Sequence, residues 1–209
     1  MISVLIADDH PMVRTGVRQL LSEDPKISEI GEAGSGIQTL QRLRQRQWSV
    51  LLLDINMPGR NGLDILRNIS VSHPETKVLV LSGFAERMYA VNVLRAGARG
   101  YLSKESAPTE LLAAIHAVVN GRRYISAEVA EQLASALDAN AAQAPHSCLS
   151  EREFQVFYKL ANGDTVSSIG NELCLSVKTV STYRSRILEK LQMQSNADMT
   201  KYAFQNSLV

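Results

Sequence analysis

Three aspartates close two apolar runs in the N-terminal part of the chain. Asp8 and Asp9 follow the run that starts at Ser3, and Asp54 follows Val50–Leu53, directly before a turn rich in Pro and Gly. Taken singly, each is most simply a turn residue. Brought close together, three carboxylates repel strongly and need a cation to stay ionised. Such oxygen ligands suit a hard ion, and Mg²⁺ fits best because it keeps waters that a phosphate can replace.

Two further polar residues end apolar runs of the same kind. Ser82 ends the run that starts at Lys77, and Lys104 ends the run RGYLSK. A lysine ammonium suits a phosphate or carboxylate oxygen, and a serine hydroxyl donates a hydrogen bond to the same group. Alone, Lys104 is a solvated lysine and Ser82 a cap or turn residue. Together with the aspartates they predict a site where a carboxylate attacks phosphorus and holds an aspartyl phosphate.

These residues converge only if the strands that carry them are parallel. Residues 1–121 alternate five apolar runs with five stretches of helical spacing, which is typical of a parallel sheet covered on both faces. Ligands of such sheets bind outside the carboxyl ends of the strands. The predicted strands are 3–8, 27–33, 49–54, 77–82 and 99–104. The predicted helices are 12–23, 36–47, 62–73, 87–98 and 106–123, the last with Ser106 as N-cap and Gly121 as stop.

The motifs around these residues resemble those of the receiver domain of bacterial two-component response regulators. They are IADDH, LLLDINMPGRNG, VLVLSGF and GYLSK, within residues 1–121. The resemblance implies a (βα)₅ doubly wound domain in which Asp54 is the phosphoacceptor. It implies that Mg²⁺ is bound directly by the carboxylates of Asp9 and Asp54 and partly through water by Asp8. The backbone carbonyl of Asn56 is implied to complete the ligand set.

The same resemblance assigns three residues to the phosphoryl contact and the switch. Lys104 is expected to contact the phosphoryl group, and Ser82 with Tyr101 is expected to form the switch pair. Many receiver domains have Pro after the lysine, whereas this chain has Glu105. This difference leaves open whether the Lys104–Glu105 peptide bond is cis, which costs roughly 3 kcal/mol without proline.

A phosphatase is the enzymatic alternative for an aspartate at a strand end. Haloacid-dehalogenase phosphatases form an aspartyl phosphate there and use a second Asp two residues on as acid and base. That position is Asn56, which cannot transfer protons in this way, and the chain has no cap-domain insertion. We therefore expect no classical enzyme activity beyond receiving a phosphoryl group on Asp54 and losing it again.

The chain changes character after residue 121. Residues 122–147 are interpreted as a helix end and an Ala-rich, polar linker, and residues 148–209 contain no strand-like run. The second part is therefore predicted to be a separate all-α domain. Its predicted helices are 150–163, 165–173, 177–191 and 196–208.

The third of these helices concentrates positive charge. Residues 177–191 contain four basic residues and one acid, whereas residues 148–209 contain seven basic and six acidic residues. One face carries an apolar stripe of Val177, Val180, Ile187, Leu188 and Leu191. Alone, such a segment is most simply a solvated helix. The short helix and tight turn before it, with Ser176 as N-cap, favour a helix-turn-helix instead.

Small hydroxyl groups on a second face of this helix suit base edges, and the flanking cations suit phosphates. The predicted DNA contacts are Lys178, Thr179, Ser181, Thr182, Arg184, Ser185, Arg186 and Lys190.

LSEREFQVFYKLANG and LCLSVKTVSTYRSRILEKL are similar to the LuxR-type helix-turn-helix, over residues 149–209. Glu153 fits the structural acid of that family, and Gly170 departs from its usual Ala-rich scaffold helix, where it would permit close packing. Both halves together resemble the NarL/FixJ class of response regulators. That class implies a transcription regulator that is phosphorylated by a sensor histidine kinase and acts on RNA polymerase.

The resemblance also implies a homodimer on double-stranded DNA, paired through the C-terminal helix. The predicted contact residues are Met199, Tyr202, Ala203 and Asn206. The alternative is that this stripe only packs on its own domain, and for Tyr202 and Ala203 this alternative is about equally good.

Composition limits the remaining classes of protein. With 45% hydrophobic and 21% charged residues the chain is globular, and its net charge of +1 indicates no partner. Cys148 and Cys174 lack metal-binding spacing. No run is long enough to span a membrane and the N-terminus is unlike a signal peptide, so we expect a cytoplasmic protein without membrane contact. The rival function is a signalling module that acts by protein contact, with a degenerate helix-turn-helix.

Overall fold

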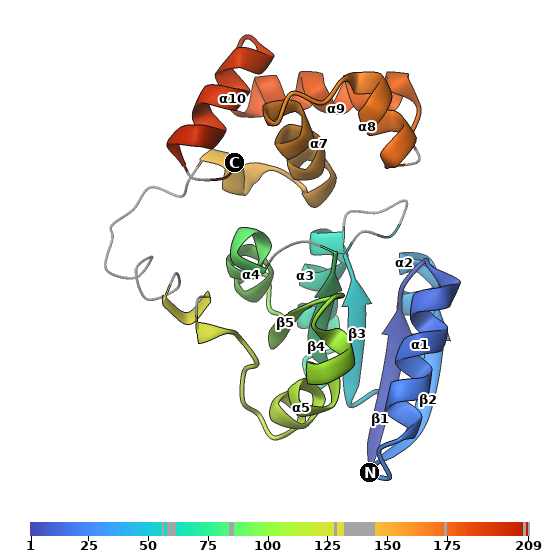
Figure 1. Ribbon diagram of the computed structural model, residues 1–209. Helices are drawn as coiled ribbons and strands as arrows, with labels where there is room; N and C mark the ends of the chain where they lie inside the picture. Colours follow the sequence, from blue (N-terminus) through green and yellow to red (C-terminus); the bar gives the residue numbers. More distant parts are fainter. Residues whose placement is uncertain are drawn as a thin grey trace. The chain divides into compact units, whose positions relative to one another are not determined.

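In the computed structural model of the protein, the chain divides into two compact units, Met1–Asn140 and Ala141–Val209. Figure 1 shows the helices and strands of both units. The predicted domain limits at residues 121 and 148 stay a prediction, because most of the predicted linker lies outside the described part of the chain. The described residues are 1–55, 57, 62–83, 86–127, 129–131, 145–173, 175–206 and 208.

The N-terminal unit is a parallel sheet with helices on both faces (Figure 1). Its strands are β1 (Ile2–Ala7), β2 (Ile27–Ala33), β3 (Val50–Asp54), β4 (Lys77–Ser82) and β5 (Gly100–Ser103), in the order β2-β1-β3-β4-β5. Its helices are α1 (Pro11–Ser22), α2 (Gly36–Gln45), α3 (Gly62–Ser72), α4 (Glu86–Arg95) and α5 (Ala107–Val119). The predicted doubly wound α/β fold is confirmed, and each strand lies within one residue of its predicted bounds.

Alternation along the strands divides the apolar core between the two faces of the sheet. Val4 and Leu52 lie on the face that packs against Val17 of α1 and Leu111 of α5. β3 is buried at all five positions, as expected for a central strand covered on both sides. The central strands therefore hold their carboxyl ends at fixed positions.

The strand register aligns the ends that carry the predicted site. Ala7 pairs with Leu53, so the residues that follow them, Asp8 and Asp54, are neighbours. Ser82 pairs with Ser103, which immediately precedes Lys104. The four strand ends thus meet at one edge of the sheet.

Helix α5 begins and ends as predicted, with Ser106 at its N-cap position and Gly121 directly after its C-cap. Its C-cap is Asn120, and Gly121 has a φ of +80°, a left-handed conformation that stops the helix. Ser106 makes no side-chain cap, because its backbone is already helical. Instead, the Ser106 N–H donates to Ser103 Oγ at 3.1 Å, which fixes the turn directly after β5.

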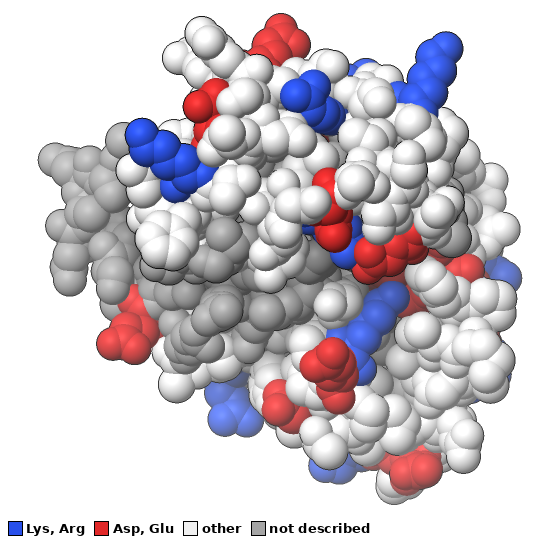
Figure 2. All heavy atoms as spheres, turned by 45° about the horizontal axis from the view of Figure 1, so that its top comes forward, with Lys and Arg blue, Asp and Glu red and all other residues white. Residues whose placement is uncertain are grey.

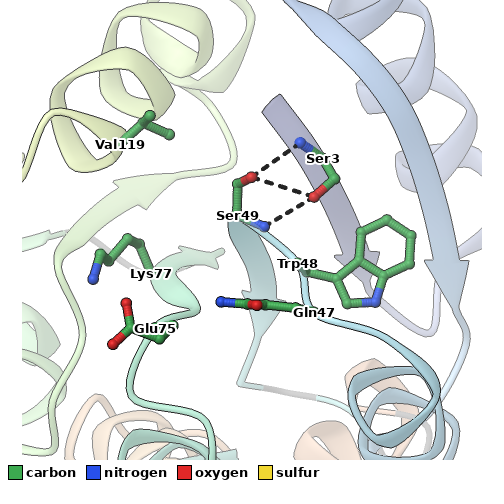
Figure 3. A pocket seen from close by; sticks show the side chains of 7 residues that line it. All are labelled: Ser3, Gln47, Trp48, Ser49, Glu75, Lys77 and Val119. Carbon is green, nitrogen blue, oxygen red and sulfur yellow. Dashed lines mark hydrogen bonds between the residues drawn. The ribbon is translucent and has the colours of Figure 1, made fainter. Parts of the chain in front are cut away.

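A second polar feature lies at the amino ends of the strands (Figure 3). Ser3 Oγ accepts a hydrogen bond from the Ser49 N–H at 3.0 Å, and Ser49 Oγ accepts one from the Ser3 N–H at 3.2 Å. The buried Trp48 lies next to them and packs on Gly31, where an added Cβ would come within 2.4 Å of the indole. These contacts fix β1 against β3 at the edge opposite the aspartates.

The C-terminal unit is all-helical. It consists of the short 3₁₀ helix η1 (Pro145–Cys148), α7 (Glu151–Ala161), α8 (Val166–Glu172), α9 (Val177–Lys190) and α10 (Asn196–Gln205). The side chains of Ser150, Thr165, Ser176 and Ser195 each accept a hydrogen bond from a backbone N–H of the first turn. All four predicted helices are present, and these caps set their starts.

The predicted turn between α8 and α9 is tight because of Gly170. The Leu175 N–H donates to the Gly170 carbonyl at 2.8 Å, and a Cβ on Gly170 would lie 2.9 Å from Leu175 O. Close packing is thus the structural reason for a glycine in α8. In the described part of the chain, no helix has the length and apolarity needed to cross a membrane.

Candidate functional site

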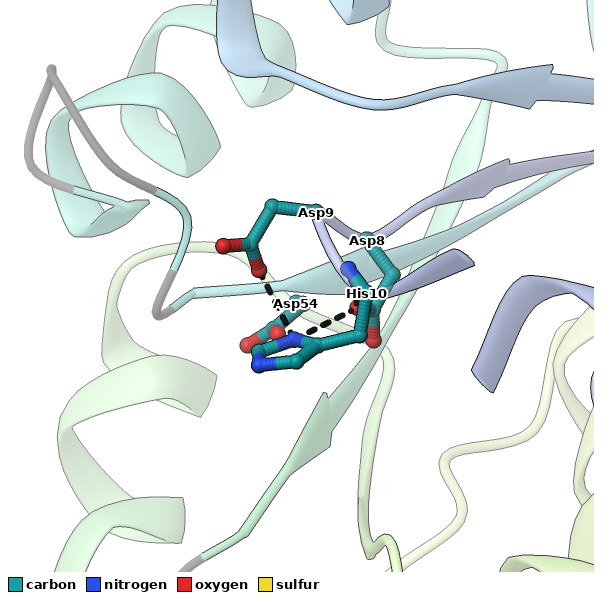
Figure 4. Close-up of side chains that lie close together, drawn as sticks. All are labelled: Asp8, Asp9, His10 and Asp54. Atoms are coloured by element: carbon teal, nitrogen blue, oxygen red, sulfur yellow. Dashed lines mark hydrogen bonds and ion pairs between the residues drawn. The ribbon is translucent and has the colours of Figure 1, made fainter. Parts of the chain in front are cut away.

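The three predicted aspartates come together at the carboxyl edge of the sheet (Figure 4). Asp8 and Asp54 are each 1% exposed, and the Asp9 side chain is 25% exposed. Each offers an oxygen within 4.8 Å of the others, and the His10 ring joins the same group. The sequence reasoning did not include His10; its position directly after Asp9 was the only available signal.

Lys104 completes this cluster from the end of β5. Its Nζ donates a hydrogen bond to Asp54 Oδ2 at 2.6 Å and lies 2.7 Å from Asp8 Oδ2. Burial acts to lower the pKa of Lys104, but the negative charges of Asp54 and Asp8 outweigh it and raise this pKa above its ordinary value. The lysine therefore stays charged and holds the two buried carboxylates together.

The donor set of the cluster fits Mg²⁺. Asp8 Oδ2 and Asp9 Oδ1 are buried oxygens that receive no hydrogen bond, although Lys104 Nζ and His10 Nδ1 lie at ion-pair distance from them. Buried carboxylate oxygens of this kind are suitable ligands for a hard divalent ion. Asn56, the remaining predicted ligand, lies outside the described residues.

The predicted switch residues are both internal. Ser82 and Tyr101 are each 0% exposed. The Ser82 carbonyl accepts a hydrogen bond from the Lys104 N–H at 2.7 Å, which connects β4 directly to the lysine. The Lys104–Glu105 peptide bond is trans.

The predicted DNA-contacting face of α9 is largely exposed. Lys178, Ser181, Thr182, Ser185 and Arg186 are all solvent-exposed. Thr182 and Ser185 each donate a hydrogen bond to a backbone carbonyl one turn earlier, at 2.9 and 3.1 Å. Their hydroxyl oxygens remain available as acceptors.

Several of these residues surround a shallow hollow of about 320 Å³ on α9. Tyr183 lines it as well and was not predicted, because an aromatic within a polar stretch gave no periodic signal. The residues around the hollow are Ser176, Lys178, Thr179, Thr182, Tyr183 and Arg186. Two cations and several hydroxyls thus share one concave surface. On the face that Figure 2 shows, the basic and acidic side chains of the described residues are interspersed.

Two predicted DNA contacts are held by the protein itself. Lys190 Nζ donates a hydrogen bond to Glu153 Oε2 at 2.6 Å, and Arg184 Nε donates one to Asn196 Oδ1 at 2.7 Å. Burial opposes ionisation of Glu153, but the hydrogen bonds from Lys190 and Ser150 outweigh burial and hold its pKa below the ordinary value. Lys190 therefore connects α9 to α7.

The apolar stripe predicted for α9 needs one correction. Val177, which was predicted to belong to it, is 53% exposed.

The predicted pairing stripe on α10 needs correction. Met199 and Ala203 are 0% exposed, because they pack into the core of their own unit. Tyr202 is half-buried, and its hydroxyl lies 2.9 Å from His146 Nδ1. Only Asn206 is exposed, and the outward face of α10 carries Phe204, which is 76% exposed. The alternative that the stripe packs on its own domain holds for Met199 and Ala203.

Both units match known protein families. A family model of the response regulator receiver domain matches residues 4–116, and a family model of the bacterial regulatory proteins of the LuxR family matches residues 147–203. The chain is 39% identical over its whole length to the response regulator GacA of Pseudomonas protegens, of which it covers 98%. It is 38% identical to the response regulator UvrY of Escherichia coli strain K12, of which it covers 96%.

Solved structures agree with these relatives. A structure of the RcsB response regulator of Salmonella typhimurium matches all of this chain and 98% of its own, with a TM-score of 0.59 and 26% identity. RcsB bound to promoter rprA in the presence of the phosphomimetic BeF₃⁻ matches 97% of this chain and 98% of its own, with a TM-score of 0.61 and 26% identity. The chain therefore belongs to the bacterial response regulators that join a receiver domain to a LuxR-family DNA-binding domain, and it is a transcription regulator.

Proposed function

We propose that phosphorylation of Asp54 switches DNA binding by this regulator. The observation that carries the proposal is the hydrogen bond of 2.6 Å from Lys104 Nζ to the buried Asp54. This pair places a carboxylate nucleophile beside a fixed cation at the edge of the sheet. A phosphohistidine of a sensor histidine kinase is the proposed donor.

In the proposed transfer, an Asp54 oxygen attacks the phosphorus of the donor. The new O–P bond forms while the bond from phosphorus to the donor's nitrogen breaks, and the electron pair leaves with that nitrogen. Lys104 neutralises negative charge that reaches the acceptor. Asp8, Asp9 and Asp54 would hold Mg²⁺, which supplies charge neutralisation for the phosphoryl oxygens when bound.

Incubation with Mg²⁺ and acetyl phosphate tests the acceptor. One acid-stable, base-labile phosphoryl group should appear on the wild-type chain. Asp54→Asn should abolish it, and Asp9→Ala should nearly abolish it through loss of a metal ligand. Label on a serine or histidine would overturn the assignment.

The buried Ser82 and Tyr101 are the proposed route from this site to the rest of the receiver. A phosphoryl group on Asp54 would draw the Ser82 hydroxyl toward itself, and the room available to Tyr101 would change with it. A switch from almost all off to almost all on needs roughly 5.5 kcal/mol of differential stabilisation. If Ser82→Ala is phosphorylated and then activates DNA binding as the wild type does, this route is wrong.

The exposed face of α9 is the proposed DNA interface. In this proposal Lys178 and Arg186 would contact phosphates, whereas the hydroxyl groups of Thr182 and Ser185 would contact base edges. The family match supports this assignment, as does the DNA-bound structure of RcsB. A module acting by protein contact is the rival, and binding to random DNA over a salt series distinguishes the two: a steep negative slope supports DNA binding, and a flat response supports the rival.

We further propose that the active form binds DNA as a symmetric pair. One helix-turn-helix makes few phosphate contacts, and two-fold dimers double them. The exposed Phe204, rather than the buried Met199 and Ala203, marks the face of α10 available for pairing. The DNA site should then be an inverted repeat with half-sites about one helical turn apart.

These roles place the protein in the cytoplasm, where promoters are accessible. Its final target would be RNA polymerase at those promoters. The expected chemistry is that of a regulator that receives a phosphoryl group on Asp54 and loses it again, without turnover of a separate substrate.

A further inference from the structure

An imidazole lies among the carboxylates of the receiver site, and the proposed phosphorylation chemistry gives it no role. His10 directly follows Asp8 and Asp9 in the loop between β1 and α1. Its backbone N–H donates a hydrogen bond to Asp8 Oδ1 at 2.7 Å, which holds the residue at the edge of the sheet. Figure 4 shows the His10 ring turned toward the carboxylates of Asp8 and Asp9.

Two distances from the His10 ring nitrogen are those of neighbouring positions around one ion. His10 Nδ1 lies 3.1 Å from Asp8 Oδ1, with which it shares a hydrogen bond, and 2.9 Å from Asp9 Oδ1. In an octahedral site with ligands at about 2.1 Å, adjacent donor atoms are about 3.0 Å apart. One oxygen or nitrogen from each of Asp8, Asp9, His10 and Asp54 falls within 4.8 Å of all the others. The ring nitrogen therefore has the placement of a fourth ligand.

The exposed His10 ring lies where an ion from solvent could reach the carboxylates. The His10 side chain is 62% exposed, whereas Asp8 and Asp54 are buried. An ion arriving from solvent would meet the imidazole and Asp9 first. His10 thus forms the outer wall of a site whose inner wall is made of carboxylates.

A nitrogen donor changes which ion such a site prefers. Mg²⁺ favours oxygen ligands and loses its waters reluctantly, whereas ions such as Ni²⁺ and Zn²⁺ bind imidazole well. A site of carboxylates alone binds ions such as Ni²⁺ more tightly than Mg²⁺ only by the general difference in affinity between these ions. An imidazole ligand in the same site increases the affinity for Ni²⁺ or Zn²⁺ more than the affinity for Mg²⁺.

We propose that His10 Nδ1 is a ligand of the ion held by Asp8, Asp9 and Asp54, and that it selects borderline divalent ions over Mg²⁺. The inference rests on the acidic metal site of the proposed function and adds its ion preference. It predicts that the receiver of this chain binds Ni²⁺ through one nitrogen and several oxygens. Occupancy in a cell would then depend on the supply of such ions as well as on Mg²⁺.

Two measurements on the full chain test this ligand. Calorimetric titrations with Ni²⁺ and with Mg²⁺ compare wild type, His10→Ala and the control His73→Ala, a histidine directly after α3. Loss of His10 should weaken Ni²⁺ binding roughly tenfold more than Mg²⁺ binding, as expected when an imidazole contact is removed from a metal site. His73→Ala should bind both ions as the wild type does. An equal loss of affinity for both ions in His10→Ala would overturn the proposal.

Pulsed electron paramagnetic resonance with Mn²⁺ observes the ligand itself. Coupling to one imidazole ¹⁴N should be present in wild type and His73→Ala and absent in His10→Ala. Mn²⁺ that is bound in an Asp54-dependent manner without ¹⁴N coupling would overturn the role of His10 but leave the acidic site intact. If Asp54→Asn and Asp9→Ala leave Mn²⁺ binding unchanged, both the acidic site and the His10 ligand are wrong.

Discussion

Lys104 Nζ lies 2.6 Å from Asp54 Oδ2 and 2.7 Å from Asp8 Oδ2. The two carboxylates come from different strands and are almost completely buried. Without a cation between them they would repel each other at short range. The lysine thus has a structural role in addition to its proposed contact with the phosphoryl group.

Lys104→Met should destabilise the receiver in Mg²⁺-free buffer. The change leaves two buried carboxylates without their cation, and we expect a loss of about 2 kcal/mol, below the range for a fully buried pair because the Lys104 side chain is 22% exposed. The only tryptophan, Trp48, lies in this unit, so its fluorescence during urea unfolding measures the effect. Lys77→Met, at the opposite edge of the same sheet, is the matched control. Equal losses in both variants would contradict the structural role of Lys104.

Added Mg²⁺ should restore part of this loss. An ion bound by the carboxylates replaces the missing positive charge, so it should stabilise Lys104→Met more than it stabilises the wild type. The same unfolding curves, measured over a Mg²⁺ series, give the comparison. Equal stabilisation of both proteins would show that lysine and ion do not share these carboxylates.

The cations and the hydroxyl groups on α9 should contribute differently to DNA binding. Lys178→Ala and Arg186→Ala should weaken binding to all sequences and reduce the salt slope by roughly one each, as expected for phosphate contacts. Thr182→Ala should instead change sequence preference. Fluorescence anisotropy over a salt series, with specific and random duplexes, separates the two effects.

Lys190 provides the control for these measurements of the salt slope of DNA binding. Because it is paired with the buried Glu153, Lys190→Met should lower the stability of the C-terminal unit. Its salt slope, measured where the variant is folded, should equal that of the wild type. A slope reduced as much as in Arg186→Ala would place Lys190 at the DNA after all.

The C-terminal unit should lose stability when the pH falls below about 6.5. Burial lowers the pKa of His146 from its ordinary value of 6.5, so the unfolded chain binds more protons than the folded one in this window. Stability is therefore present above pH 6.5 and is lost as the pH falls toward the folded pKa. Hydrogen exchange of amides in α7, measured between about pH 7 and pH 5.5, follows the change. After correction for the intrinsic exchange rate, His146→Gln should flatten this dependence, and an identical dependence in both proteins would contradict it.

Phe204→Ser should weaken paired binding without unfolding the domain. The side chain is 76% exposed, so its loss removes little packing within the unit. We expect weaker binding to an inverted repeat and little change on a single half-site. The matched control is Val71→Ser, an exposed residue of α3 in the other unit that should change neither. Equal binding of wild type and Phe204→Ser to the repeat would exclude this face from pairing.

Sequence patterns predicted the strand ends better than the side-chain partners. The position of Asp8, Asp54, Ser82 and Lys104 at one edge follows from the parallel direction of the strands, which the alternation of strands and helices along the chain already indicates. That Lys190 meets Glu153 across 37 residues does not follow, because helical periodicity gives a face but not the neighbour that covers it. For the same reason the sequence left open whether the stripe on α10 contacts a partner or its own domain, and only the structure shows that Met199 and Ala203 are buried.

The link between Asp54 and DNA is the central claim, and one binding titration tests it most directly. A selected inverted repeat is titrated with the wild-type chain before and after treatment with acetyl phosphate and Mg²⁺, and Asp54→Asn is treated in the same way. Treatment should increase the affinity of the wild-type chain for the repeat and leave Asp54→Asn unchanged. An equal increase in both proteins, or no change in a wild-type sample shown to carry the phosphoryl group, would contradict the proposed switch.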